Sequence, residues 1–338
     1  MPKIGTRSYS LEVKDEHMNK TVVIEPPTEI QFDITMAIYS KLSIGYMKVY
    51  NPDTYLKNFL LYRYPVGDER NKLYIDFKPI KLGVAKDGYT AYSYASSTKA
   101  YVYQTTLIHP NPKEEYIHLE LLSGYYNLFS KVYNTTEKSR VNTTVDSLLK
   151  MLSKEGYPVS YDGSLRTNTR LFSSRKPLKE MFDELLKLDE ESSTSYIEDL
   201  NLKIFKADPE KGQGSRGRIG SYDRPYEIDP EDGLISFPQQ VNNDIVFRHT
   251  LDYKFPLDSY VRVSKDMVNR QIVTPSVNAG AGGLNWLLGY EDKYRVLSYR
   301  LVGDYFDPGV WYQDIVAQSG NMPLAANLSY NSTIGAGL

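Results

Sequence analysis

Regular alternation of apolar and polar residues is the feature that most constrains this chain of 338 residues. In the stretch from Asp232 to Val263, the residues at every second position from Ile245 to Leu251 are Ile, Phe, His and Leu, and the alternation resumes at Val261 and Val263. A period of two is typical of antiparallel strands with one buried face. Turn residues and a Phe255-Pro256 break separate three such strands, and nothing in the stretch has the pattern of a catalytic motif.

Strand patterns recur in the first and last thirds of the chain. Further strands are predicted at Ile30–Ile34, Ile44–Tyr50, Leu73–Phe77, Ala100–Ile108, Tyr116–Leu122, Tyr294–Val302 and Trp311–Ala317. Turn signals such as Asn51-Pro52-Asp53 and Pro110-Asn111-Pro112 separate them, and a short helix is expected directly after the first of these turns. Short strands spaced in this way predict a small barrel or sandwich.

The middle of the chain changes to a helical period. Thr143 with Asp146 forms a capping-box pattern, which predicts a helix that begins there and ends at Gly156. Pro177 suits the first position of a second helix. A hairpin follows over Tyr196–Phe205, with its turn expected at Glu198-Asp199. We therefore predict a mainly β chain with an α+β insert: a first β domain over 1–130, the insert over 131–207, a second β domain over 208–320 and an extended tail over 321–338. No short repeat is found, which leaves open that the two β domains are structural copies.

Composition excludes several classes of protein. Forty Lys and Arg against 42 Asp and Glu argue against a dedicated nucleic-acid binder or a polybasic membrane protein. No apolar run approaches the roughly 18 residues of a membrane span, and the first residues do not resemble a signal peptide. Zero Cys removes disulfides, cysteine-based zinc sites and thiol nucleophiles. We expect a protein that is made and assembled in a cytoplasm and has no cofactor.

Aromatic composition favours subunit contacts. The chain has 30 Tyr against 11 Phe and 2 Trp. Tyrosine suits half-buried β surfaces because its ring packs while its hydroxyl stays hydrated, and it is also enriched at interfaces. A β-rich fold alone is the alternative explanation.

Glycine-rich segments invite a phosphate-binding interpretation that their context does not support. Gly212–Gly217 matches G-x-G-x-x-G, but Gly220, Pro225 and Pro230 prevent the helix that this mechanism needs. The basic residues in and after that segment fit a solvated or subunit-contacting loop better than a nucleic-acid site. Asn278–Gly283 is expected to be a flexible connection that lets Trp286 dock.

Catalytic constellations are not indicated either. The four histidines show no metal-binding spacing; His118 with Glu120 lies on one strand face, and His249 is expected inside a strand. The acidic clusters at Glu190-Glu191 and around Asp229 fall at helix ends or turns, where carboxylates are ordinarily solvated or capping. No G-x-S-x-G elbow or P-loop is present. We predict no catalytic residues, no metal site and no enzymatic activity.

The order of these motifs resembles one family, the central baseplate hub of bacteriophage tails, of the Mu-type, contractile-tail kind. The segments that carry the resemblance are Ile30–Ile34 followed by Met47–Pro52, the hairpin at Ala100–Leu122, the helix and strand of Leu178–Phe205, the Gly233–Val263 stretch, and Tyr294–Ala317 with Gly303-Asp304 and Trp311. Pro52 departs from the family, in which Leu is commoner. The similarity extends from about Ile24 to Gln318, although each motif is short.

The resemblance implies a structural virion protein: a homotrimer whose subunits each contribute two tube-like β-barrel domains, giving six around the axis and reconciling threefold with sixfold symmetry. Its implied partners are the tail tube protein, a spike or central fibre protein and other baseplate proteins, with no membrane and no sequence-specific nucleic acid. Our interface candidates are Trp286, Leu287, Trp311 and Tyr312, together with the C-terminal tail. The alternatives are a carbohydrate- or receptor-binding β module of the virion, a hydrolase domain of the tail tip, and a tail-tube or tube-initiator protein.

Overall fold

The computed structural model describes most of the two β-rich regions and part of the segment between them. It covers residues 8–39, 43–61, 72–84, 90–94, 97–124, 176–187, 192–206, 219–231, 233–241, 244–251, 253–264, 293–307 and 309–319, with isolated positions at 70, 132–133, 150, 153–154, 159 and 267. The predicted helix at Thr143–Gly156, both glycine-rich segments, Trp286, Leu287 and the tail lie wholly or largely outside these residues.

The N-terminal lobe is built from antiparallel strands. They are β1 (Tyr9–Asp15), β2 (Lys20–Ile24), β3 (Ile30–Ala37), β4 (Ser43–Tyr50), β5 (Leu73–Val84), β6 (Thr90–Tyr94), β7 (Thr98–Asn111) and β8 (Glu114–Leu122). Helix α1 (Thr54–Leu61) begins where predicted, because the Asp53 carboxylate accepts a hydrogen bond from the Leu56 N–H at 2.7 Å and caps it.

The C-terminal lobe has the second set of strands. They are β13 (Tyr226–Ile228), β14 (Leu234–Val241), β15 (Asp244–Thr250), β16 (Tyr260–Val263), β17 (Lys293–Asp304) and β18 (Trp311–Ser319). Strands β13 and β16 pair in parallel, and the other pairs of this lobe are antiparallel. Every strand predicted from alternation in either terminal third lies in one of the observed strands.

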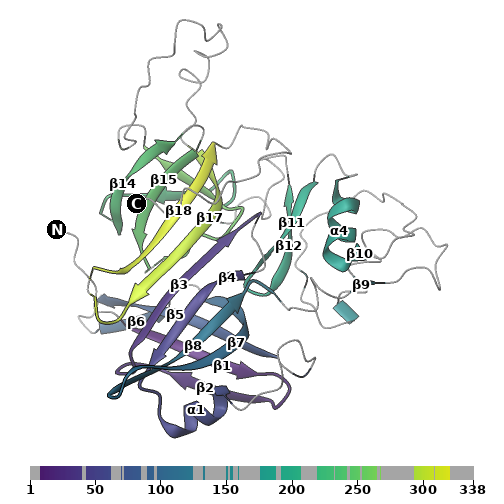
Figure 1. Cartoon of the computed structure of the whole chain (residues 1–338). Coiled ribbons are helices and arrows are strands. Elements are labelled where there is room, and N and C mark those ends of the chain that lie inside the picture. The colour runs from purple at the N-terminus through teal and green to yellow at the C-terminus, as the bar shows by residue number, and fades with distance from the viewer. Residues whose placement is uncertain are drawn as a thin grey trace, which may run out of the picture.

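The insert lies beside the two lobes (Figure 1). It contains the short pair β9 (Val132–Tyr133) and β10 (Lys176–Pro177), helix α4 (Leu178–Leu186), and the hairpin of β11 (Ser192–Glu198) and β12 (Asn201–Lys206). The helix predicted to begin at Pro177 is α4; it begins one residue later, at Leu178, since Pro177 belongs to β10. Phe182 and Leu186 of α4 are fully buried. The hairpin turn lies at Asp199-Leu200, one residue later than predicted, and both residues have positive φ.

One sheet joins the two lobes (Figure 1). Its strand order is β14-β15-β18-β17-β3-β4-β8-β7-β5-β1-β2, and strands β6, β13 and β16 attach to it at the sides. At the lobe boundary, β17 and β3 pair antiparallel from Ser298–Ala37 to Asp304–Gln31; we call this pairing the seam.

The mainly β class is confirmed, but two closed barrels are not. Among the described strands no sheet closes on itself. Over Ser298–Asp304, β17 pairs with β3 of the other lobe. The domain boundaries at 130, 207 and 320 stay predictions.

The hydrophobic core also crosses the seam. On β3 the side chains of Ile30, Phe32, Ile34 and Met36 are all buried on one face, as the alternation predicted. Trp311 of the C-terminal lobe packs edge-on against Phe32 of the N-terminal lobe, with ring centroids 5.2 Å apart. The lobes therefore share apolar packing as well as backbone hydrogen bonds. Within the described part, no helix has both the length and the hydropathy to span a membrane.

A polar sheet face and a buried junction as candidate functional sites

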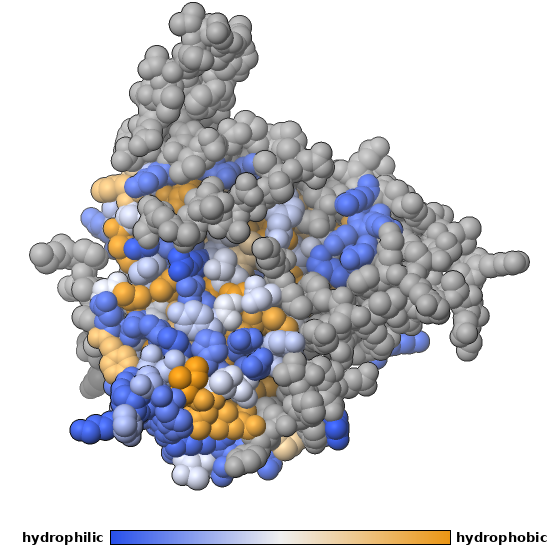
Figure 2. All heavy atoms as spheres, in the orientation of Figure 1, coloured by the Kyte–Doolittle hydropathy of each residue, from blue (hydrophilic) through white to orange (hydrophobic). Residues whose placement is uncertain are grey.

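The face of the sheet opposite the core is polar and continues across both lobes. We call it the polar face; it comprises the alternate residues Arg248, Tyr312, Asp314, Arg300, Asp33, Gln31, Tyr46, Lys48, Tyr50, Tyr116 and His118 of strands β15, β18, β17, β3, β4 and β8. These side chains are half-buried. Along each strand they alternate with residues whose side chains are buried on the core side. Figure 2 shows one side of the molecule, where hydrophilic and hydrophobic patches are interspersed over the coloured surface.

Two arginine–aspartate pairs neutralise the centre of the polar face. Arg300 donates to both oxygens of Asp33, at 2.9 and 2.7 Å, and Arg248 donates to both oxygens of Asp314, at 2.7 and 3.1 Å. The Arg248 guanidinium also lies 3.7 Å from the ring centroid of Tyr312. The hydrogen bonds with Asp33 raise the pKa of Arg300 well above its ordinary value. Both pairs are bidentate, which fixes orientation as well as charge.

Aromatic rings gather at the N-terminal end of the polar face. The Tyr50 ring lies 5.2 Å from both the Tyr116 ring and the Phe306 ring, and Tyr46 stacks on His118 at 5.4 Å. We call these five residues the aromatic cluster. Phe306 is 55% exposed. The sequence distributes these rings over β4, β8 and the β17–β18 turn, and the register of the sheet brings them together.

A polar network supports the aromatic cluster. The Lys48 ammonium donates to Gln31 Oε1 at 2.7 Å and lies 5.3 Å from the centroids of both Tyr46 and Tyr116. Gln31 Nε2 in turn donates to Asp304 at 2.9 Å. Burial is the largest influence on His118 and lowers its pKa, so this histidine is neutral near pH 7.

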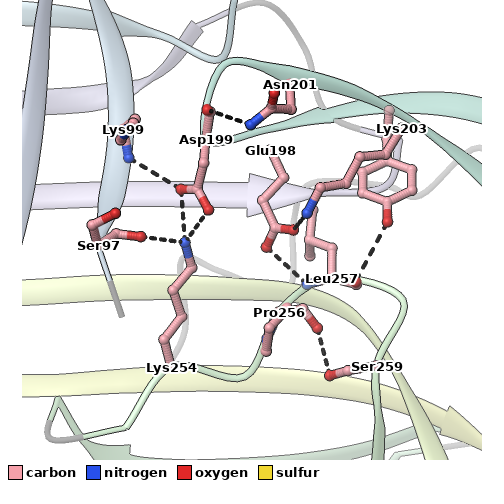
Figure 3. Close-up of polar contacts among 11 residues, drawn as sticks. Ser97, Lys99, Glu198, Asp199, Asn201, Lys203, Lys254, Pro256, Leu257 and Ser259 are labelled. Atoms are coloured by element: carbon pink, nitrogen blue, oxygen red, sulfur yellow. Dashed lines mark hydrogen bonds and ion pairs between the residues drawn. The ribbon is translucent and has the colours of Figure 1, made fainter. Parts of the chain in front are cut away.

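The tip of the β11–β12 hairpin forms a buried polar junction (Figure 3). Asp199 accepts two hydrogen bonds from the Lys254 ammonium, at 2.7 and 2.6 Å, and one from the Lys99 N–H at 3.0 Å. Lys254 is 6% exposed and also donates to the Ser97 carbonyl at 2.9 Å. Ser97 and Lys99 belong to the N-terminal lobe and Lys254 to the C-terminal lobe, so the tip binds both.

Glu198 strengthens this junction from within the core. Its side chain is fully buried, and its carboxylate accepts hydrogen bonds from the Leu257 N–H at 2.8 Å and the Lys203 ammonium at 2.7 Å. Leu200, which has a φ of 64°, is buried with Tyr101 and Leu122 of the N-terminal lobe. A leucine in this conformation is costly, and its burial against the lobe offsets that cost.

A second buried ion pair lies close to the insert. The Arg295 guanidinium forms an ion pair with Asp258, and its central carbon lies 3.7 Å from the ring centroid of Phe205 on β12. Arg295 is 5% exposed and Asp258 is fully buried. The insert is thus fixed to the C-terminal lobe by cation–π contact as well as by hydrogen bonds.

The predicted interface residues have different locations. Trp311 is partly buried against the shared core, near Tyr9, Phe32 and Phe77. Tyr312 lies on the polar face against Arg248. Trp286 and Leu287 lie outside the described residues. The assignment of all four to subunit interfaces stays a prediction.

The remaining candidate residues from the sequence analysis, where the structure describes them, do not form a reaction centre. His249 lies in β15, as predicted, with its ring 5.2 Å from that of Phe255. Asp229 accepts a hydrogen bond from the Glu231 N–H at 2.9 Å, which is the turn-capping role expected from the sequence. Glu190 and Glu191 lie outside the described residues. In the part that the structure describes, no three His, Asp or Glu side chains gather as a metal site would require.

Sequence comparison identifies no relative: no family model matches the chain, and no curated protein matches it. The fold, in contrast, is similar to solved tail proteins. The 43 kDa tail protein of prophage MuSo2 from Shewanella oneidensis aligns over 93% of this chain and 97% of its own length, with a TM-score of 0.51 and 9% identity. A tail protein from Neisseria meningitidis MC58 aligns over 92% and 96%, with a TM-score of 0.49 and 8% identity.

A third similar structure is the prophage tail protein gp18 from Listeria monocytogenes EGD-e, which aligns over 94% of this chain and 95% of its own length at a TM-score of 0.44 and 9% identity. At such low identity the likeness to the MuSo2 protein establishes a shared fold. The resemblance predicted from the order of motifs is therefore confirmed at the level of the fold: this chain has the fold of a phage tail protein.

Proposed function

We propose that this chain is a structural component of a phage tail baseplate, the central hub that links the tail tube to the spike or central fibre. The observation that carries the proposal is the near-complete alignment with the MuSo2 prophage tail protein, over both lobes and the insert together. Its work is geometric: it positions partners through large surfaces and turns over no substrate. Its place is the virion tail, after assembly in the host cytoplasm.

The proposed hub is a homotrimer with two lobes from each subunit, so that six lobes surround one axis. Two features support this. The lobes are joined rigidly by the seam and by the buried junction, which suits a part that must hold a fixed angle between them. The polar face is continuous over both lobes and both of its arginines are paired with aspartates, so it can line a ring without attracting strongly charged molecules.

Symmetry is the property to measure. Mass photometry and electron-microscopy class averages of the purified chain should give a stable trimer with six similar lobes in projection. A ring of six chains would instead support the tail-tube or tube-initiator alternative. A strict monomer at high concentration would contradict both.

The aromatic cluster favours a second candidate, a carbohydrate-binding or receptor-binding module. Aromatic rings beside hydrogen-bonding side chains suit a sugar, and Tyr50, Phe306 and Gln31 are arranged in this way. Glycan-array binding by the wild-type chain that is lost in Phe306→Ala would support this candidate. Failure to bind any glycan at high protein concentration would exclude it.

A further inference from the structure

Lys254 is the only buried lysine among the residues that the structure describes. It lies between β15 and β16 in the C-terminal lobe, and its ammonium reaches the tip of the β11–β12 hairpin of the insert (Figure 3). There it donates to both oxygens of Asp199, at 2.7 and 2.6 Å, and to the Ser97 carbonyl at 2.9 Å. Burying a charged pair costs free energy that its mutual attraction offsets only in part. A reaction that removes both charges together therefore also removes this cost.

The Lys254 nitrogen is held against the carboxyl carbon of Asp199. Because it lies within 2.7 Å of both oxygens, it is about 3 Å from the carbon that joins them, which is the separation of atoms poised to react. Two groups held in such a geometry have an effective concentration on the order of 10⁵–10⁸ M. Bond formation between them is then favoured over hydrolysis by solvent water, which is far more dilute.

One oxygen of Asp199 has a second donor. In addition to the Lys254 ammonium, Oδ1 accepts the Lys99 N–H at 3.0 Å. A fixed backbone donor stabilises the negative charge that develops on a carboxyl oxygen when a nucleophile attacks its carbon. The Lys254 ammonium donates to Oδ2 at 2.6 Å, so protons are directed at the oxygen that would have to leave. The Asp199 side chain is 23% exposed, which leaves a route for a released water molecule.

The surroundings of the pair favour its neutral form. Tyr299 is fully buried, and its ring centroid lies 5.5 Å from the Lys254 nitrogen. Burial, followed by the charges of Glu198 and Asp199, raises the pKa of Tyr299 well above its ordinary value, which places both carboxylates beside this buried ring. In such a site, transfer of a proton from the ammonium to a carboxylate costs less than in water, and it produces the neutral amine that is the nucleophile.

We propose that Lys254 and Asp199 condense to an isopeptide bond that joins the insert covalently to the C-terminal lobe. The lone pair of the Lys254 nitrogen, freed when the ammonium gives up a proton, forms the new N–C bond to the carboxyl carbon. The C–Oδ2 bond breaks, and the oxygen leaves as water with the two protons that the nitrogen has lost. Oδ1 remains as the amide carbonyl oxygen, with the Lys99 N–H as its donor. The ion pair and the amide plus water contain the same atoms, so no oxidant, reductant or further reactant takes part.

The Lys179–Asp183 pair on α4 is an internal control of the same residue types. Its ammonium is also 2.6 Å from a carboxylate oxygen, Oδ2 of Asp183, but Oδ1 accepts the Ser195 N–H at 3.0 Å. The Lys179 side chain is 20% exposed, against 5% for Lys254, so its charge stays hydrated. We expect no condensation at this pair.

The isopeptide bond acts on the unfolded chain as a disulfide does. It closes a loop between two residues 55 positions apart, in a chain that has no cysteine with which to form a disulfide. Closing a loop lowers the conformational entropy of the unfolded state and so stabilises the folded one. The bond depends only on the buried junction, so it stands or falls independently of the proposed hub and its symmetry.

Mass spectrometry of the denatured wild-type chain tests the proposal directly. Condensation lowers the intact mass by one water, about 18 Da. Trypsin does not cleave after an acylated lysine, so a digest should contain one branched peptide in which residues 188–203 are joined to residues 249–262. Fragmentation of this peptide should place the link at Asp199 and Lys254. A folded wild-type chain with the full sequence mass, and separate peptides 188–203 and 249–254, would mean an ion pair only and would overturn the proposal.

Two variants separate the cross-link from other losses of water. Lys254→Arg keeps a cation beside Asp199, but its guanidinium does not form the amide, so its mass should equal the sequence mass. Lys179→Arg is the matched control and should keep the loss of one water. A loss of water that persists in Lys254→Arg points to dehydration of Asp199 alone, as in a succinimide, and overturns the proposal. The wild-type digest needs no variant, so it decides the question even if Lys254→Arg fails to fold.

Discussion

Arg300 and Asp33 form a bidentate ion pair across the seam although they are 267 positions apart in the chain. They lie on adjacent strands of the two lobes, and their side chains are 37% and 26% exposed. The pair couples the lobes in register, because a shift of the seam by one residue would move Arg300 to the core face.

Removing this pair should weaken the seam measurably. We expect Arg300→Met to lower the free energy of unfolding by about 1–2 kcal/mol, since the pair is bidentate but only half-buried. Urea unfolding of Arg300→Met, Asp33→Asn and the double variant would give the coupling energy. The matched control is Arg262→Met, whose partner Glu227 is 62% exposed and whose loss should cost less than about 0.5 kcal/mol. Equal losses in both arginine variants would contradict a special role for the seam pair.

Gly45 is required by the backbone of β4. Its φ is +139°, and a Cβ at this position would clash with the backbone oxygen of Asp33 on the neighbouring strand. Gly45→Ala should therefore destabilise the fold by about 3 kcal/mol or more, measured by thermal or urea unfolding. Gly309→Ala is the control: its added Cβ would lie 3.3 Å from the Asp307 carboxylate, and a change within about 1 kcal/mol is expected. A Gly45→Ala chain as stable as wild type would show that the strand can shift locally.

Alternation predicted the strands because it records which face of each strand is buried. Ile30, Phe32 and Ile34 lie on the core side of β3, and Ile245, Phe247 and His249 lie on the core side of β15. Alternation says nothing about which strand lies next to which. The pairing of β17 with β3 depends on edges that meet only after both lobes fold. Neither alternation nor the family resemblance, which implied two barrels, therefore indicated the one sheet that both lobes share.

The candidate sites were harder to predict, for the same reason. Tyr46, Tyr116 and Phe306 form one cluster through register alone, and no spacing in the sequence places them together. One signal was present: Lys254 stands between apolar residues in a segment that must be buried, and a buried lysine requires an acidic partner. The identity of that partner, Asp199, follows only from the docking of the hairpin.

The Lys254–Asp199 pair should be far more costly to break than the surface pairs. Lys254→Met leaves the Asp199 carboxylate without its main cation, and a loss of about 3 kcal/mol is expected in urea unfolding. Adding Asp199→Asn should recover part of that loss, because the uncompensated charge is removed. Lys78→Met, which breaks a more exposed pair with Glu12, should cost less than about 1 kcal/mol. Similar losses for both lysines would mean that the junction does not fix the insert.

Asp244, at the start of β15, should make stability depend on pH. Burial raises the pKa of its carboxyl from 3.8 to about 6. The unfolded carboxyl ionises at the lower value and the folded one at the higher value, so its contribution to stability falls as pH rises between them and stays low above them. Asp244→Asn should thus stabilise the chain at pH 7–8 by about 1 kcal/mol, a figure reduced for the partial solvent exposure of the group, and should have little effect below about pH 4. Urea unfolding across this pH range, with the exposed Glu231→Gln as control, measures it. The control should follow the wild-type profile, and an Asp244→Asn profile parallel to wild type at every pH would refute the assignment of the effect to this carboxyl.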